Sequence, residues 1–313
     1  MEYRNLGSTG LKVSVVGIGC NNFGRRCDQG TTKSVVDKAI DAGITLFDTA
    51  DVYGPTGLSE EYLGKALQGR RQETVVASKF GSPMGEGDLM RGASRRYIFN
   101  AVEASLKRLG TDYLDLYQLH FPDVSTPIEE TLGALDDLVS QGKVRYLGNS
   151  NFSGWQIADA DWQARSGNLN RFVTAQNLYS LLDRRIEREV VPACQRFGLG
   201  ILPYFPLASG MLTGKYTRGE APPQGSRLEQ WGGRAAAALS DKNFDIVENL
   251  TTFAAERDHS LLELAFSWLA SLPYISSVIA GATTPDQVEA NAAAADWQLS
   301  PKEQQQVAEI SKQ

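Results

Sequence analysis

Eight strand-like segments, each followed by a helix-like segment, recur along the chain, and this alternation limits the fold more than any other feature. In order, the strand-like segments are SVVGIGC, ITLFDTA, TVVASKFG, YLDLYQLH, VRYLGNSNF, VTAQNLYS, GILPYFP and SSVIAGA. They are short and mostly apolar without strict alternation, as the strands of a parallel sheet covered by helices must be. Eight such units in 313 residues favour an α/β fold of the closed (β/α)8 type, the TIM barrel, over an open doubly wound sheet.

Three stretches fall outside this repeat. Residues 2–14, EYRNLGSTGLKVS, predict an N-terminal β-hairpin, and residues 301–313 predict a last helix after the eighth unit. The polar stretch 207–240, after the seventh strand, is too long for an ordinary connection, so we expect a functional loop there. Pro192 should bend or break the helix that precedes the seventh strand. No Pro/Ser-rich linker divides the chain, which predicts a single domain, 1–313.

The composition argues against several classes of partner. Thirty-one basic and 37 acidic residues give a net charge of −6, whereas a nucleic-acid or anionic-membrane surface needs a basic stripe. No segment is long and apolar enough to span a bilayer. The three cysteines, Cys20, Cys27 and Cys194, lack metal-ligand spacing and a disulfide pattern, which indicates a reducing compartment. We therefore expect a cytoplasmic protein that binds neither nucleic acid nor membrane.

Four ionisable side chains stand at or just after the ends of successive predicted strands. The second strand ends at Asp48 and leads to Tyr53, the third carries Lys79, and the fourth ends at His120. Each residue alone has an ordinary explanation, as a turn former, a solvated charge or a hydrogen-bonded histidine. In a barrel of this type, however, the carboxyl ends of all strands meet at one mouth, where active sites lie. The sequence therefore predicts that these four groups converge.

The chemistry of the four groups fits the reduction of a carbonyl. A lysine ammonium beside a phenol favours loss of the phenolic proton, so Lys79 would help Tyr53 to act as a general acid. Asp48 would hold Lys79 in place and keep it charged, and His120 would direct the substrate oxygen by a hydrogen bond. A hydride is also needed, and because no side chain supplies one, a nicotinamide cofactor is implied.

Several motifs carry a resemblance to a known family. FDTADVYG, ASKFG, LYQLHFPD, LGNSNF, AQNLYSLLDR, PYFPLASGMLTGKY and IAGATTPDQVEAN resemble the motifs of the aldo-keto reductase superfamily, nearly from end to end. Within it, the chain is most similar to the branch with bacterial aldo-keto reductases and the β-subunits of voltage-gated potassium channels. The resemblance implies a catalytic tetrad of Asp48, Tyr53 as proton donor, Lys79 and His120.

The same resemblance implies where the cofactor binds. Ser150, Asn151 and Gln176 would hydrogen-bond the nicotinamide carboxamide, and Tyr204 would stack on the ring. The stretch 207–240 would then be a cofactor-clasping loop. Further implied contacts are Phe205, Pro206, Leu207, Ser209, Gly210, Lys215 and Arg227 along the phosphates, and Gly281, Thr283, Gln287 and Asn291 at the adenosine end.

Departures from the family pattern bear on the choice of cofactor. Alanine stands at Ala280 where the family often has proline, and at Ala290 where a glutamate commonly meets the adenine. Thr283 and Thr284 occupy the region where relatives often place a basic residue for the 2′-phosphate. NADPH is nevertheless preferred over NADH, because Lys215 and Arg227 could still bind phosphate, Arg227 through charge-assisted hydrogen bonds.

Other cofactor patterns fail. GIGCNNFG lacks a glycine required for the dinucleotide fingerprint and the lysine of a Walker A loop, and two histidines without clustered cysteines make a zinc site unfavourable.

The aromatic residues Phe23, Phe121, Trp155 and Trp231 follow strand ends or lie in the long loop, and are candidates for an apolar substrate pocket. Alternatively, they only seal the barrel mouth.

Three hypotheses follow. The favoured one is NADPH-dependent reduction of a small-molecule aldehyde or ketone to an alcohol. The second is a nicotinamide-binding regulatory subunit with negligible turnover. The third is an unrelated barrel enzyme in which Lys79 forms a Schiff base. A homo-oligomer is compatible with all three.

Overall fold

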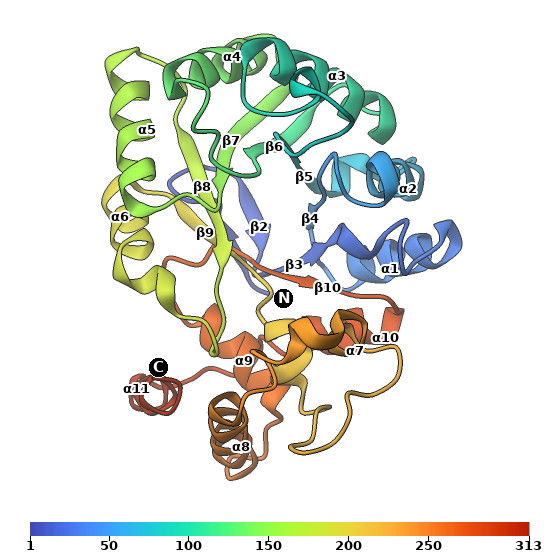
Figure 1. Ribbon diagram of the computed structural model, residues 1–313, viewed down its shortest axis with the longest axis vertical. Coiled ribbons are helices and arrows are strands. Elements are labelled where there is room, and N and C mark those ends of the chain that lie inside the picture. The colour runs from blue at the N-terminus through green and yellow to red at the C-terminus, as the bar shows by residue number, and fades with distance from the viewer. Residues whose placement is uncertain (313) are drawn as a thin grey trace.

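The computed structural model describes residues 1–312 and confirms the predicted barrel (Figure 1). Eight parallel strands close into a ring in the order β10-β3-β4-β5-β6-β7-β8-β9. These strands are β3 Val16–Gly19, β4 Leu46–Asp48, β5 Val75–Phe80, β6 Leu114–Leu119, β7 Val144–Ser150, β8 Phe172–Leu178, β9 Gly200–Tyr204 and β10 Val278–Gly281. Each begins and ends within the segment predicted for it or one residue beyond it.

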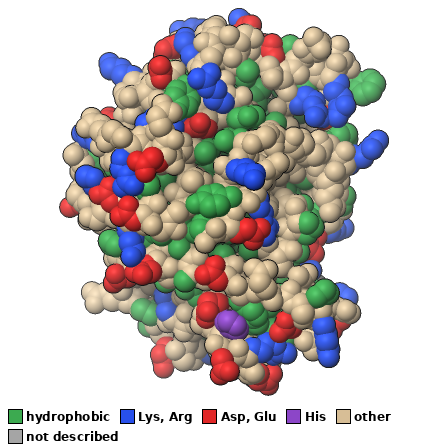
Figure 2. Space-filling model, turned by 180° about the vertical axis from the view of Figure 1, so that it is seen from behind, with side chains coloured by type: hydrophobic (Ala, Val, Ile, Leu, Met, Phe, Trp, Pro, Cys, Tyr) green, Lys and Arg blue, Asp and Glu red, His purple; other side chains and the backbone are tan. Residues whose placement is uncertain are grey.

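Helices surround the ring and cover its outer face (Figure 1). They are α1 Gln29–Asp41, α2 Leu58–Ala66, α3 Arg95–Leu109, α4 Ile128–Ser140, α5 Gly154–Ser166, α6 Val190–Phe197, α7 Arg227–Trp231, α8 Asp241–Ala255, α9 Leu261–Ala270, α10 Pro285–Ala293 and α11 Pro301–Ile310. Within residues 1–312, no helix combines the length and the apolar character needed to cross a bilayer. Acidic and basic side chains are interspersed over the face seen in Figure 2.

Helix α3 shows how local signals set the boundaries of these elements. Its N-cap Ser94 accepts a hydrogen bond from the Tyr97 amide, and its C-cap Gly110 has the left-handed φ of 63°. Between the caps, the apolar residues that recur at helical spacing, such as Ile98 and Val102, are buried against the barrel.

The predicted N-terminal hairpin, β1 Tyr3–Asn5 and β2 Lys12–Ser14, closes one end of the barrel. Leu6 and Val13 pack with Leu46, Leu116 and Leu202 in a cluster inside the ring, separate from the larger core between strands and helices. The Gly7 turn has a φ of 58°, and a Cβ there would lie 2.3 Å from the carbonyl oxygen of Val173. The hairpin can approach the barrel this closely only with glycine at its turn.

Two segments differ in detail from the sequence-based expectation. The segment with Pro192 is divided into a 3-10 helix, Arg185–Arg188, and α6, in which the proline occupies the first turn, where no amide bond is lost. The stretch 207–240 is not wholly irregular, because it contains 3-10 turns and the short helix α7. Helix α8 was not expected from the sequence, although Ser240 caps it and Phe244, Val247 and Leu250 are buried along it.

Candidate active site

A cavity of about 650 Å³ opens at the carboxyl ends of the barrel strands. Asp48, Tyr53 and His120 are on its wall, and Lys79 lies directly behind them with no exposed surface. Strands β4 and β5 are neighbours in the ring, paired so that Asp48 lies opposite Ala77. Because side chains alternate along a strand, Lys79, two residues further on, also points into the barrel. The structure thus brings together the four groups that the sequence placed at separate strand ends.

The Lys79 ammonium joins the acid and the phenol of this group. Its Nζ lies 2.6 Å from Oδ2 of Asp48 and donates to the Thr49 carbonyl at 2.9 Å. The same nitrogen lies 3.5 Å from the Tyr53 hydroxyl. Lysine therefore touches both partners at once, as the proposed proton chemistry requires.

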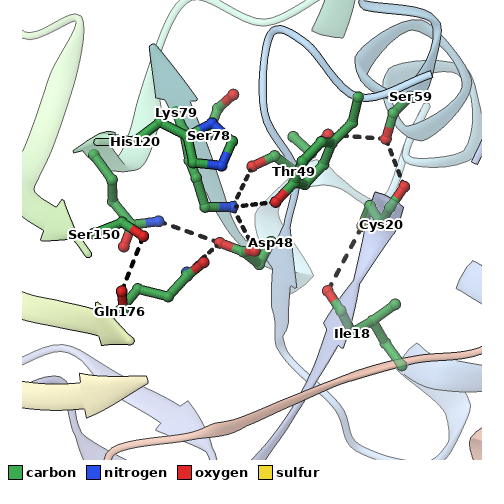
Figure 3. Close-up of polar contacts among 12 residues, drawn as sticks. Ile18, Cys20, Asp48, Thr49, Ser59, Ser78, Lys79, His120, Ser150 and Gln176 are labelled. Carbon is green, nitrogen blue, oxygen red and sulfur yellow. Dashed lines mark hydrogen bonds and ion pairs between the residues drawn. The ribbon is translucent and has the colours of Figure 1, made fainter. Parts of the chain in front are cut away.

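The Asp48 carboxylate is fixed from its other side by two amides. Gln118 and Gln176 donate to Oδ1 at 3.2 and 2.8 Å, which leaves neither carboxylate oxygen without a partner. Figure 3 shows Asp48 between Lys79 and Gln176. Gln118 was missed at the sequence level. A single glutamine within the segment YLDLYQLH does not indicate a function by itself, because its contact with Asp48 forms only between strands that are distant in the sequence.

Burial and charge act in opposite directions on Tyr53 and Lys79. Burial raises the pKa of the Tyr53 hydroxyl, Lys79 opposes that effect, and the net direction is upward. The sequence had suggested only the influence of the lysine, so burial corrects the expected direction. Burial alone would lower the pKa of Lys79, but Asp48 and Tyr53 outweigh it and the pKa is raised. These shifts favour the protonated phenol of Tyr53 and the charged form of Lys79, and an ammonium is unsuited to form a Schiff base.

His120 is neutral in this site. Burial, and then the charge of Lys79, lower the pKa of its imidazole to about 3. The ring stacks on Phe121 with centroids 4.9 Å apart and meets the Tyr53 ring edge-on at 5.6 Å. The imidazole can thus donate a hydrogen bond without carrying charge.

Strands β7 to β9 carry the predicted nicotinamide contacts, and all of these line the cavity. Asn151 has a φ of 62°, an uncommon conformation that turns its amide to accept from the Tyr204 hydroxyl at 2.7 Å. Its Nδ2 donates to Ser150 Oγ at 3.0 Å. The side-chain nitrogen of Gln176 is taken by Asp48, so its amide oxygen is the part left to meet a ligand.

The far end of the cavity fits a phosphate-bearing cofactor. Phe205, Ala208 and Ser209 all have positive φ, so the loop after β9 turns in tight steps of a kind that expose backbone amides to anions. Gly210, with a φ of 100° that favours glycine, lies beside the Lys215 side chain, and a Cβ there would lie 2.7 Å from Cε of Lys215. The other predicted phosphate and adenosine contacts also line the cavity: Pro206, Leu207, Arg227, Gly281, Thr283, Gln287 and Asn291.

Comparison with known proteins agrees with this geometry. The model of the aldo/keto reductase family matches residues 15–312. The chain belongs to the aldo/keto reductase family. It is 38% identical to a probable voltage-gated potassium channel subunit beta of Oryza sativa subsp. japonica, over 95% of this chain and 92% of that protein. It is 34% identical to L-glyceraldehyde 3-phosphate reductase of Escherichia coli (strain K12), over 93% of this chain and 86% of that protein. It is 35% identical to aldo-keto reductase YhdN of Bacillus subtilis (strain 168), over 98% of this chain and 92% of that protein.

Membership confirms the resemblance found in the motifs, including the link to both bacterial reductases and potassium channel subunits. As an aldo/keto reductase, the protein is an oxidoreductase that acts on the carbonyl group of a small molecule. The Schiff-base hypothesis is thereby set aside.

One cationic residue of this aldo/keto reductase was missed. Arg26, on the loop after β3, lines the cavity, and its guanidinium contacts the Gly225 carbonyl of the long loop. Burial lowers the pKa of the nearby Arg227, and repulsion from Arg26 and Arg25 lowers it further. A bound anion would relieve this repulsion. The pair RR at 25 and 26 was the only signal, and it did not show which arginine faces the cavity.

Three of the four aromatic residues predicted for the substrate pocket do not line the cavity. Phe23 is completely buried in the outer core, because the chain turns back after β3 and packs it behind the wall. Trp155 and Trp231 lie on α5 and α7 at the protein surface, 65% and 39% exposed. Phe121 does line the cavity, 54% exposed beside His120. Of these four, Phe121 therefore remains the candidate for a substrate contact near the reacting groups.

Proposed function

We propose that this protein reduces an aldehyde or ketone to an alcohol with NADPH, and that Tyr53 supplies the proton. The observation that carries the proposal is the contact of one buried ammonium, Lys79, with both Asp48 and the Tyr53 hydroxyl on the cavity wall. When bound, NADPH supplies the hydride that adds to the carbonyl carbon. Ser150, Asn151, Gln176 and Tyr204 would hold the nicotinamide end.

The four polar groups have distinct roles in this proposal. Tyr53 gives its proton to the carbonyl oxygen as that oxygen gains negative charge. Lys79 stabilises the phenolate that remains, and Asp48 keeps Lys79 charged and in place. His120, neutral and buried beside Tyr53, holds the carbonyl oxygen by a hydrogen bond. The hydride and the proton together convert the carbonyl to an alcohol.

The preference for NADPH rests on the basic groups at the far end of the cavity. Lys215, Arg26 and Arg227 all line it, whereas Thr283 offers only a hydroxyl at the adenosine end. The 2′-phosphate adds about two negative charges to the cofactor, and guanidinium groups bind phosphate with strong, charge-assisted hydrogen bonds. We therefore expect Arg227→Ala to weaken NADPH binding more than NADH binding.

The test is to follow reduced-nicotinamide absorbance with a reactive aromatic aldehyde, for the wild type and Tyr53→Phe. General acid catalysis contributes about 10²- to 10⁴-fold, so Tyr53→Phe should lose at least about 100-fold in kcat. Cofactor binding, measured by quenching of protein fluorescence, should persist in this variant. Equal turnover in both proteins would disprove the role of Tyr53.

A second candidate function is supported by the relatives themselves. Two of them, from Oryza sativa subsp. japonica and Arabidopsis thaliana, are described as probable voltage-gated potassium channel subunits beta, at 38% and 39% identity. A regulatory subunit of this kind would bind NADPH saturably yet turn over none of a broad panel of aldehydes and ketones. Turnover of any of these carbonyls at enzymatic rates would favour the reductase.

A further inference from the structure

The imidazole of His120 is held in place from several sides. Its backbone amide donates to Phe80 at 2.9 Å, and its carbonyl accepts from Asn151 Nδ2 at 3.0 Å. The ring lies flat on Phe121, with 18° between the planes, and edge-on to Tyr53. These contacts fix where the ring is, but none of them decides which ring nitrogen carries the proton.

That choice matters because the ring is neutral. A neutral imidazole has one N–H donor and one acceptor nitrogen. A carbonyl oxygen has only acceptor lone pairs, so the nitrogen that meets it must carry the hydrogen. If the proton sat on the other nitrogen, two lone pairs would face each other and His120 would repel the substrate oxygen.

Among residues 1–312, Ser82 provides the one side-chain hydrogen bond that distinguishes the two ring nitrogens. Its Oγ lies 3.2 Å from Nδ1 of His120, and Oγ has no second hydrogen-bond partner among residues 1–312. Ser82 is buried on the loop after β5, and its carbonyl accepts from the Tyr97 hydroxyl at 3.3 Å, which holds the residue in position. The Ser82 hydroxyl proton is therefore free to point at Nδ1.

We propose that Ser82 is a positioning residue, whose hydroxyl donates to Nδ1 of His120 and thereby keeps the ring proton on Nε2, ready for the substrate oxygen. The inference rests on the proposed function for its purpose, but the proton position is a property of the protein alone. It can be measured without cofactor or substrate, so the two proposals can fail independently.

The chain is well suited to this measurement, because it has two histidines in all. Long-range ¹H–¹⁵N correlation spectra of protein labelled at histidine distinguish protonated from unprotonated ring nitrogens. His259 serves as an internal reference, since it does not line the cavity: it is half-buried, stacked on Trp297, with Nδ1 3.2 Å from Glu263. At neutral pH, His120 of the wild type should show a protonated Nε2 and an unprotonated Nδ1. The opposite pattern in the wild type would overturn the proposal whatever the variants do.

Three variants complete the test. Ser82→Ala should shift His120 towards the tautomer protonated at Nδ1, whereas Ser82→Thr, which retains a hydroxyl, should keep the wild-type pattern. Ser125→Ala is the matched control, because it removes a hydroxyl that bonds to Asp123 on the neighbouring loop. The His259 signals should be the same in all four proteins. A His120 spectrum of Ser82→Ala identical to that of the wild type would refute the assignment.

Kinetics then connects the tautomer to the reaction. The loss of one neutral hydrogen bond changes a rate or equilibrium constant by about fivefold, so the kcat/KM of Ser82→Ala should fall by at least about fivefold. Ser82→Thr should retain most of the wild-type kcat/KM. An altered His120 spectrum without that fall would show that Ser82 sets the tautomer but that catalysis does not depend on it, which overturns its positioning role. If the wild type reduces no carbonyl, the spectra still decide the tautomer while the proposed function fails.

Discussion

Two buried ion pairs lie on opposite sides of strand β5, and they differ in their surroundings. Inside the barrel, Lys79 pairs with Asp48, and both carboxylate oxygens have donors. Outside it, Arg108 Nε lies 2.7 Å from Oε2 of Glu60, whose other oxygen accepts from Ser78 at 2.5 Å. Ser78 and Lys79 are adjacent, so the alternation of a single strand directs one to each pair.

The outer pair has an extra acid beside it. Asp51 is 1% exposed, and neither of its carboxylate oxygens has a hydrogen-bond partner among the described residues. Burial, together with the nearby charge of Glu60, raises the pKa of Asp51 to about 7, although Arg108 and Lys79 oppose this. The inner group is thus electrostatically complete, whereas the outer one contains a carboxylic acid that titrates near neutral pH. The comparison teaches that burial of charge alone does not mark a catalytic site, since only the inner pair reaches the cavity wall.

The largest effect is expected from breaking the inner pair. Lys79→Met leaves Asp48 charged and buried without a cation, which should cost about 3 to 5 kcal/mol of unfolding free energy. Urea unfolding measures this loss. The double variant Lys79→Met/Asp48→Asn should recover much of the stability but none of the carbonyl reduction. If the single and double variants were equally stable, the pair would not be coupled.

Breaking the outer pair should lower the free energy of unfolding somewhat less than breaking the inner pair. Arg108 is 17% exposed at its side chain, so water can partly compensate when Arg108→Met leaves Glu60 alone. We expect a loss of about 3 kcal/mol, at the low end for buried pairs, with kcat of the folded protein little changed. Urea unfolding and turnover at saturating substrate test both parts. A collapse of kcat in a fully folded variant would show that the outer pair also serves catalysis.

Asp51 should make the stability depend on pH. Because its folded-state pKa of about 7 lies above the ordinary value of 3.8, the folded protein binds an extra proton between these values. Its ionisation therefore lowers stability as the pH rises from about 4 to 7, and the penalty is complete above 7. Asp51→Asn removes this penalty, so the stability of the variant relative to the wild type should rise by about 3 kcal/mol between pH 4.5 and pH 8. Urea unfolding of both proteins at the two pH values tests this prediction. A stability difference that does not change with pH would contradict the titration of Asp51.

The smallest effects sharpen the comparison at single hydrogen bonds. Ser78→Ala removes a donor from Glu60, and Gln118→Met removes one from Asp48, and each should cost about 1 to 2 kcal/mol in stability. Only Gln118→Met should also lower kcat, because only Asp48 supports Lys79 beside Tyr53. Equal kinetics in the two variants would remove the functional distinction between the pairs.

Much of the barrel could be predicted because its signals are local. The eight apolar segments and the helical spacing in α3 are properties of neighbouring residues, and the structure confirms them. Helix α8 was not predicted because its N-cap, Ser240, is the last residue of the long polar stretch and was assigned to that loop. The convergence of Asp48, Lys79 and His120 followed from topology, since all strand ends of a barrel meet.

The finer features of the site could not be predicted, because they depend on packing. Gln118 and Ser82 belong to no motif, and their contacts exist only once strands far apart in sequence lie side by side. The direction of the Tyr53 pKa is the difference between burial and the charge of Lys79, which sequence does not quantify. The positions of Phe23, Trp155 and Trp231 depend on how the loops turn after each strand.

The N-terminal hairpin has a consequence for how the protein is made. The Gly7 amide donates to the Ser276 hydroxyl at 3.0 Å across 269 residues of sequence, and β3 pairs with β10, the last strand. During synthesis, the edge of β3 that pairs with β10 must stay unpaired until nearly the whole chain has left the ribosome. Such long-range closure slows folding and exposes an unpaired edge in the meantime. We therefore expect nascent chains that lack β10 to aggregate or to be held by chaperones.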